Sequence, residues 1–467
     1  MTPTLFMAMN AETGRTANGG VTNTTSFSKC LDLFNIIGSS RGKDLVPQFR
    51  SAMAENPEVA LRILQWVRDC RGGAGEREVF RIILRYLVTV TPEAAIAILR
   101  KVPALGYWKD VIRLYDVKEF RPTIHEMIAI SLAANDGLCA KYMPRKGKEA
   151  AQIRKALGLS APEWRKLVVS MSNTVEQKMC AKKWDDIDFG KIPSLAGARL
   201  QKAFMRNAEA RYKEYIALLE KGEAKINAST LYPYDVLKSV RSGIATVADQ
   251  QWKALPNYME GTDERILPLI DVSGSMMCGS GITGMDCMHV AISLGLYMSE
   301  RAPGPFKDHF MTFESRPKMM VVPQGSTLSQ RYEHIRRAPW CGGTDIQKAF
   351  ETLLDSAMQF KVPQDQMPTT IVILSDMEFN SSSVRGREAT AFRMIEDRYR
   401  RAGYKRPKLV FWNLNGRNGN NPVTMGEGGT AMVSGASPAI LTSILGAKDF
   451  NPYNIMLEAV MKDKYAL

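Results

Sequence analysis

Histidine is scarce in this sequence, and no arrangement of catalytic side chains is visible. The 467 residues include four histidines, none in the His-Glu-x-x-His spacing of zinc hydrolases and none beside an obvious nucleophile. The glycine-rich stretch Arg71–Glu76 lacks the Gly-Lys-Ser/Thr ending of a phosphate loop and follows a helical pattern rather than a strand. These absences argue against hydrolase and phosphate-loop chemistry, and we expect a protein that is not an enzyme.

Long apolar runs and paired cysteine motifs are missing as well. No run of about 18 apolar residues is available to cross a bilayer. The opening residues Met1–Thr4 lack the basic stretch of a secretory signal, so a cytoplasmic location is the default expectation. The seven cysteines form no Cys-x-x-Cys pair, and an odd number leaves one unpaired whatever the connectivity. We therefore expect reduced thiols.

Positive charge, in contrast, is in excess. The formal net charge is +14 and the sequence pI is about 9.4. A basic surface attracts polyanions, which makes RNA or an RNA-rich particle the natural class of partner. The alternative is that the excess charge only keeps the protein soluble, and charge alone does not decide between the two.

Three regions differ in composition and in the spacing of their apolar residues. Residues 1–26 are rich in Thr, Asn and Gly and predict an N-terminal arm, because such a composition cannot bury enough apolar surface to order itself alone. From residue 27 to 250, apolar residues recur at spacings of three and four, which predicts a helical domain of short stacked helices, as in a solenoid. Asn56 and Thr91 each stand before a proline and predict capped helix starts.

Residues 260–467 change to short apolar runs that alternate with amphipathic segments. Strands are predicted at Ile266–Ile270, Phe310–Phe313, Met320–Val322, Ile371–Leu374, Leu409–Trp412 and Ala431–Val433. Helices are predicted at Met285–Glu300, Ile346–Met358 and Ala391–Arg401. The pattern indicates an α/β domain around a mainly parallel sheet. Since such sheets bind ligands at the carboxyl ends of their strands, a site is expected just after Ile270 and Leu374.

Oxygen-bearing side chains gather at those two places. Asp271, Ser273 and Ser275 form an Asp-x-Ser-x-Ser motif after the first predicted strand, Thr344 precedes a predicted helix, and Asp376 follows a buried strand. In order and spacing they resemble the metal-ion-dependent adhesion site of von Willebrand factor A domains. The resemblance implies a Rossmann-like domain that binds Mg²⁺ or Mn²⁺. The first motif alone is also compatible with simple helix capping.

The resemblance also implies a role for each of these ligands. The hydroxyls of Ser273, Ser275 and Thr344 would bind the ion directly, while Asp271 and Asp376 would orient bound waters. Neutral direct ligands leave the ion electrophilic, so an open coordination position could accept a carboxylate from an acidic protein partner. Two methionines beside the motif, Met276 and Met277, could add an apolar rim, although most methionines are expected in the core.

The helical region resembles a known family as well. The motifs that carry this resemblance are Arg68–Arg77, Tyr142–Lys148, Lys182–Asp188, Val410–Leu414 and Val433–Gly435. They are similar to an uncharacterised family of viruses, phages, fungi and plants with a C-terminal von Willebrand factor A domain. The architecture resembles the Ro autoantigen, whose TROVE domain is a ring of HEAT-like repeats closed by the metal-site domain. Ro-type proteins bind small structured RNAs and single-stranded RNA ends, so the resemblance implies RNA binding.

A basic stretch between residues 141 and 213 offers candidate RNA contacts. The residues are Lys141, Arg145, Lys146, Lys148, Arg154, Lys155, Arg165, Lys166, Lys182 and Lys183. Tyr142, Trp164 and Trp184 are interleaved and could stack bases. The alternative places the basic residues on solvated helix faces and the tryptophans in the core. A second functional class also stays open, a protein-interaction adaptor without RNA, for instance a partner of a MoxR-type AAA+ ATPase.

Overall fold

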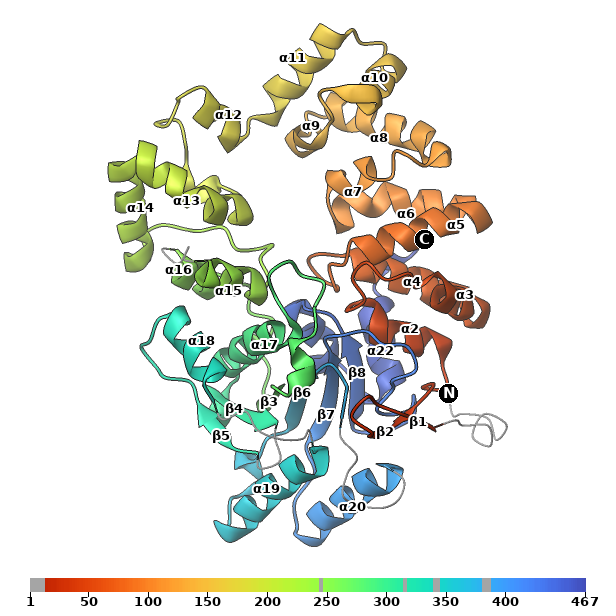
Figure 1. Ribbon diagram of the computed structural model, residues 1–467, viewed down its shortest axis with the longest axis vertical. Coiled ribbons are helices and arrows are strands. Elements are labelled where there is room, and N and C mark those ends of the chain that lie inside the picture. Colours follow the sequence, from red (N-terminus) through yellow and green to blue (C-terminus); the bar gives the residue numbers. More distant parts are fainter. Residues whose placement is uncertain (1–12, 243–246, 314–316, 339–344, 380–387) are drawn as a thin grey trace.

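The computed structural model describes residues 13–242, 247–313, 317–338, 345–379 and 388–467. Within these ranges, no helix combines the length and the apolar character needed to span a bilayer. The N-terminal part is helical and the C-terminal part is built around a mixed, mainly parallel sheet, as the sequence pattern predicts (Figure 1).

Fifteen described α-helices precede the six-stranded sheet. They are α2 (Lys29–Ile37), α3 (Val46–Glu55), α4 (Pro57–Arg68), α5 (Glu78–Val90), α6 (Pro92–Leu105), α7 (Trp108–Ile112), α8 (Arg121–Ala133), α9 (Gly137–Tyr142), α10 (Gly147–Ala156), α11 (Ala161–Ser172), α12 (Val175–Cys180), α13 (Ser194–Asn207), α14 (Glu209–Lys221), α15 (Pro233–Arg241) and α16 (Ala248–Lys253). Asn56 caps α4 by accepting a hydrogen bond from Val59 N at 3.1 Å, as predicted. Thr91 precedes α6, but its side chain makes no capping hydrogen bond, so that part of the prediction is wrong.

The C-terminal part places six strands in one sheet. They are β3 (Ile266–Asp271), β4 (His309–Phe313), β5 (Met319–Val321), β6 (Thr370–Ser375), β7 (Lys408–Asn413) and β8 (Thr430–Ser434). Their order across the sheet is β5-β4-β3-β6-β7-β8, with only the edge strand β5 antiparallel to its neighbour. All six predicted strands are confirmed, with ends shifted by about one residue. Counted from β3, the order is 3-2-1-4-5-6, a doubly wound arrangement whose order reverses between β3 and β6.

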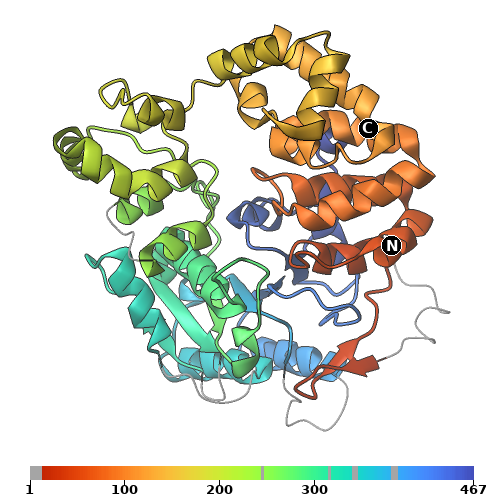
Figure 2. The same cartoon turned by 45° about the horizontal axis from the view of Figure 1, so that its top comes forward.

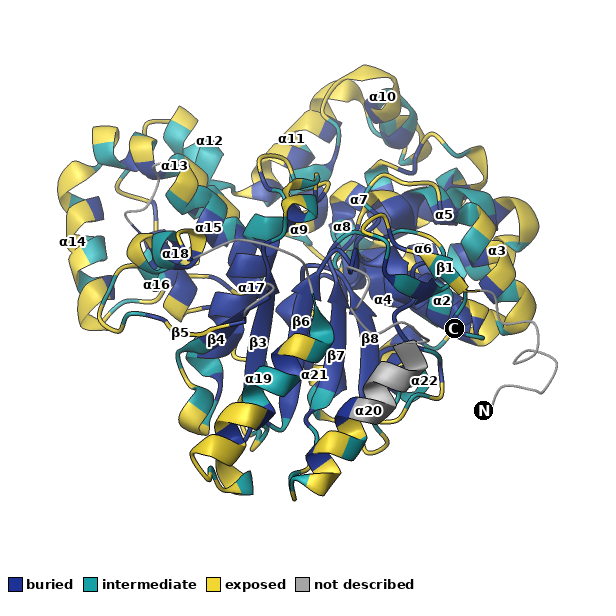
Figure 3. Cartoon of the chain, turned by 60° about the horizontal axis from the view of Figure 1, so that its bottom comes forward, coloured by how far each residue is buried: buried dark blue, intermediate teal, exposed yellow. Residues whose placement is uncertain are grey.

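Helices and buried strands make this sheet a layered core. The helices of this part are α17 (Cys287–Arg301), α18 (Leu328–Arg336), α19 (Ile346–Gln359), α20 (Glu388–Arg401), α21 (Leu441–Leu445) and α22 (Pro452–Val460). Every residue of β3, β6 and β8 is buried (Figure 3). Continuous apolar strands of this kind are typical of a parallel sheet that is covered on both faces.

The described end of the N-terminal arm forms a hairpin instead of an unstructured segment. Strands β1 (Thr13–Arg15) and β2 (Val21–Asn23) pair with each other, and Asn23 exchanges backbone hydrogen bonds of 3.0 and 3.1 Å with Asn421. The hydroxyl of Thr16 donates to the carbonyl of Phe379 at 2.6 Å. The composition correctly indicates that this segment cannot order itself alone, but loops from the other end of the chain supply the surface that orders it.

The chain closes into a ring (Figures 1 and 2). At one seam, α2 packs on β8 and α22 packs on α4; at the other, α15 packs on α17 and α18. The C-terminal residues strengthen the first seam, because Gln65 Nε2 donates to Tyr465 O and Tyr465 Oη donates to Asp69, each at 2.7 Å. The arc of helices is therefore held at both ends by the sheet domain.

Candidate metal centre and ring interior

Two aspartates meet where the strand order reverses. Asp271 is the last residue of β3, and Asp376 directly follows the last residue of β6. The parallel register sets Ile270 opposite Leu374, so the two strands end at the same level of the sheet. Both aspartates are fully buried. The two aspartates that the sequence places at these strand ends therefore lie close together in the fold.

The two serines of the motif link these aspartates. Ser273 N donates to Asp271 Oδ1 at 2.9 Å, and the hydroxyls of Ser273 and Ser275 lie 2.9 Å apart. Ser275 Oγ then donates to Asp376 Oδ1 at 3.3 Å. Four of the five predicted metal-site residues are therefore brought together. The fifth, Thr344, lies outside the described residues, as does Cys341 beside it.

The electrostatics of the pair leave its negative charge only partly compensated, by Arg417 near Asp376. Burial raises the pKa of Asp271 to about 6, against hydrogen bonds from Ser375 and Ser273 that lower it, and the charge of Asp376 raises it further. Burial likewise raises the pKa of Asp376. Among the described residues, no donor makes a hydrogen bond to the buried Asp376 Oδ2. Two adjacent carboxylates in low dielectric, with a lone oxygen unsatisfied, are the situation that a bound cation relieves.

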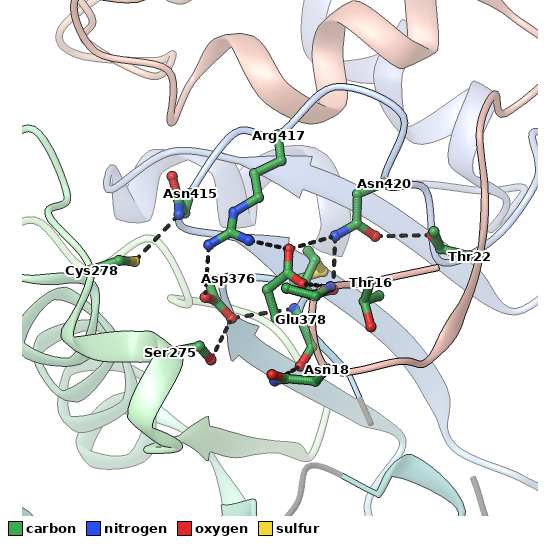
Figure 4. Close-up of polar contacts among 12 residues, drawn as sticks. Thr16, Asn18, Thr22, Ser275, Cys278, Asp376, Glu378, Asn415, Arg417 and Asn420 are labelled. Carbon is green, nitrogen blue, oxygen red and sulfur yellow. Dashed lines mark hydrogen bonds and ion pairs between the residues drawn. The ribbon is translucent and has the colours of Figure 1, made fainter. Parts of the chain in front are cut away.

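A network of polar contacts links Asp376 to Arg417, Glu378 and the N-terminal hairpin (Figure 4). Arg417 Nη2 lies 3.8 Å from Asp376 Oδ2, and Arg417 Nη1 donates to Glu378 at 2.6 Å. The buried Glu378 also accepts hydrogen bonds from Asn420 Nδ2 at 3.3 Å and from the backbone N–H of Ala17 in the hairpin. The N-terminal hairpin therefore contacts the loop that follows Asp376.

A cavity of about 860 Å³ lies between α5, α7, α9, α12, α13 and α15. Its cationic lining residues are Arg77, Arg81, Lys109, Arg113, Lys141, Arg199 and Lys238, and its acidic ones are Glu78, Asp110, Glu176 and Asp235. Tyr107 and Tyr142 also line it, with Arg77 over the ring of Tyr107 at 5.3 Å and Lys141 over that of Tyr142 at 5.8 Å. The cavity therefore combines excess positive charge with aromatic faces.

Three of the acids in this lining are already paired with arginine, and the first of them, Glu78, forms an ion pair with Arg81. Asp110 accepts from Arg68 Nε and from Arg81 Nη1, each at 3.0 Å. Glu176 accepts from Arg199 Nη2 at 3.0 Å. Because these pairs cancel charge locally, the surplus positive charge of the lining is concentrated on the remaining lysines and arginines.

Comparisons with known proteins place the chain in a family. The profile described as Domain of unknown function (DUF2828) matches residues 16–118 and 120–263, which is more than half of the chain. The chain belongs to the DUF2828 family. A second profile, Domain of unknown function (DUF7788), matches residues 266–465. An uncharacterized protein of Acanthamoeba polyphaga mimivirus is 29% identical over an alignment that covers 95% of this chain and 86% of the viral protein.

Most of the predicted RNA contacts of this DUF2828 protein lie away from the cavity. Of the ten predicted residues, Lys141 alone is among its lining residues. The others are exposed or half-exposed on α10, on α11, in the loop before α10 and in the loop after α12; they are Arg145, Lys146, Lys148, Arg154, Lys155, Arg165, Lys166, Lys182 and Lys183. Trp164 is buried and donates its Nε1 hydrogen to Pro144 O at 3.0 Å, so the core alternative holds for it. Trp184 is half-buried against a small separate core of α13 and α14.

Sequence reasoning missed the cavity residues Arg77, Lys109, Arg113, Arg199 and Lys238. These residues are spread over more than 160 positions of the chain, and local charge density does not single them out. Glu378 offered a weak signal, because an acid two residues after a candidate ligand commonly belongs to the same loop. Nothing in the sequence pairs it with Arg417 or with the hairpin.

Proposed function

We propose that this chain is an RNA-binding protein without enzymatic activity, made of a HEAT-like helical domain and a von Willebrand factor A-type domain that binds a protein partner through a divalent metal. The observation that carries the RNA part is the cavity inside the ring, which is lined by seven cationic side chains, four acids and two tyrosines. Cations neutralise phosphates, and aromatic faces stack unpaired bases.

The ligand is most simply a single-stranded segment of RNA. Each base stacked on an aromatic face contributes about 1 to 3 kcal/mol, and a cavity of about 860 Å³ has room for a few nucleotides but not for a duplex. Arg77 lies over the ring of Tyr107 and Lys141 lies over the ring of Tyr142, so each candidate stacking residue has a phosphate-binding cation in contact with it.

The donor set at the strand ends fits Mg²⁺ or Mn²⁺. Hydroxyl and carboxylate oxygens are the donors that these hard cations prefer, and the unsatisfied Asp376 Oδ2 marks a place for a cation or its water. Asp271, Ser273, Ser275, Thr344 and Asp376 would hold the ion. When bound, the ion would supply an electrophilic position for the carboxylate of an acidic partner. Met277, with 72% of its surface exposed next to the motif, would provide an apolar rim.

Filter binding of single-stranded RNA to the full chain tests the RNA proposal. We expect Lys109→Ala, Arg113→Ala and Lys141→Ala combined to lower affinity about tenfold or more. The slope of log affinity against log salt should also fall, by about one for each phosphate that the variant no longer neutralises. The matched control combines Arg145→Ala, Lys146→Ala and Lys148→Ala, which removes the same charge outside the cavity lining.

The results separate the hypotheses. Equal reductions in affinity in both triple variants contradict the cavity as the RNA site. Absence of salt-dependent RNA binding contradicts the RNA function and favours the second candidate, an adaptor that acts only through the metal site, for instance on a MoxR-type AAA+ ATPase. The observation that favours this second candidate is the exposed Met277 beside the metal motif.

A further inference from the structure

Two cysteines face each other at the end of the metal-site loop. Cys278 follows η3 (Gly274–Met277), the short helix that contains Ser275, and Cys287 begins α17. Their sulfur atoms lie 3.2 Å apart. A disulfide bond is about 2.05 Å long, so an approach of roughly 1 Å would join them.

The backbone already holds the two residues opposite each other. Cys287 N donates to Cys278 O at 3.1 Å, and the adjacent pair Gly279 and Asp286 forms an antiparallel bridge. The segment between the cysteines is therefore a closed loop before any sulfur chemistry occurs. Because the fold already brings the thiols together, little backbone rearrangement is needed to join them.

The two thiols differ in access and in their neighbours. Cys278 is partly exposed and accepts a hydrogen bond from Asn415 Nδ2 at 3.3 Å. Cys287 is fully buried, and its thiol donates to Leu414 O at 3.5 Å. A small oxidant from solvent would meet Cys278 first. Cys287 stands behind it as the resolving thiol, a common arrangement in redox-sensitive proteins.

We propose that Cys278 and Cys287 form a reversible disulfide in response to hydrogen peroxide or an organic peroxide. With hydrogen peroxide, the sulfur of Cys278 attacks one oxygen, the O–O bond breaks, and Cys278 sulfenic acid and one water are formed. The sulfur of Cys287 then attacks the sulfur of Cys278, the S–O bond breaks, and a second water leaves. Two thiols lose two electrons in total, and the peroxide gains them. A dithiol reductant returns the pair to thiols by exchange.

The disulfide would act on the metal loop, and this part of the inference rests on the proposed function. Cys278 N donates to Ser275 O at 3.1 Å, so any movement of Cys278 is passed to a residue proposed to bind the ion. We expect the affinity for Mg²⁺ to differ between the reduced and oxidised protein by about fivefold or more, which is a typical size for coupling between sites.

Peptide mapping of the full-length protein tests the disulfide independently of any metal. A protease that cleaves before aspartate separates Asp271–Met285, with Cys278, from Asp286–Lys307, with Cys287. After brief treatment with equimolar hydrogen peroxide and alkylation of free thiols, we expect these two peptides to be joined, and dithiothreitol to separate them. Cys278→Ser and Cys287→Ser should each abolish the joined species, and Cys180→Ser, at an exposed site on α12, should leave it unchanged.

Two alkylated peptides after oxidation, or Cys278 joined to Cys341 instead, would overturn the proposal. Calorimetry with Mg²⁺ on the reduced and oxidised forms then tests the coupling: equal affinities overturn the coupling while the disulfide stands. Absence of Mg²⁺ binding to both forms would contradict the proposed metal site, and the conclusion about the disulfide from peptide mapping would still stand.

Discussion

At the scale of single residues, Asp376 combines two opposing roles. Its buried carboxylate has a raised pKa, which means that the charged form costs stability at neutral pH, and one of its oxygens has no hydrogen-bond donor among the described residues. A group that destabilises the empty fold is retained where a ligand uses it. This tension is what the proposed metal site predicts for Asp376.

We expect Asp376→Asn to raise the thermal stability of the metal-free protein and to lower the affinity for Mg²⁺ about 10- to 100-fold. The asparagine keeps the volume and removes the buried charge next to Asp271. Differential scanning and titration calorimetry on the same preparation measure the two effects. Asp365→Asn, at an exposed position of η5 (Gln364–Gln366), is the control and should change neither. A variant with lower stability and unchanged Mg²⁺ affinity would assign Asp376 a purely structural role.

At the scale of elements, Glu378 is one of the residues that hold the N-terminal hairpin in place. This carboxylate binds the backbone of Ala17, Arg417 and Asn420, and hydrogen bonds to charged groups are worth about 1.5 to 3 kcal/mol each. We expect Glu378→Ala to increase trypsin cleavage after Arg15 about tenfold or more, because the hairpin opens more often. Glu58→Ala, which removes an exposed partner of Arg62 on α4, is the control for an acid unrelated to the hairpin. Equal cleavage in both variants would show that other contacts hold the hairpin.

Elements were predictable from sequence wherever the signal is local. The run Ile371–Leu374 is apolar because β6 is buried on both faces, and the strand extends only one residue further at each end. Asn56 was recognised as a cap because its hydrogen bond spans three residues. The hairpin was not predictable, because its partners Phe379 and Asn421 are more than 350 positions away. The cavity residues were not predictable for the same reason, because closure of the ring, and not a local sequence pattern, brings them together.

At the scale of the whole molecule, the ring depends on a seam made by the last residues of the chain. Asp69, just after α4, accepts hydrogen bonds from Lys464 Nζ, Tyr465 Oη and the backbone N–H of Arg71. Burial alone would raise the pKa of Asp69, but these donors outweigh it and lower the pKa. The seam that joins the helical arc to the sheet domain therefore contains a carboxylate that is stabilised in its charged form.

The direction of this shift predicts how the seam responds to pH. Because the folded pKa of Asp69 lies below its unfolded value, its contribution is fully present above the ordinary carboxyl range near pH 4 and is lost as the pH falls through the folded pKa. We expect Asp69→Asn to lower the free energy of unfolding at pH 7 by about 1 to 3 kcal/mol, and the difference from the wild type to shrink below about pH 4. Urea unfolding of both proteins across this pH range measures the difference in their free energies of unfolding. Asp116→Asn, an exposed partner of Arg85, should cost at most about 1 kcal/mol. A difference for Asp69→Asn that stays constant with pH would mean that the seam is held by packing of Tyr465 and not by the charge of Asp69.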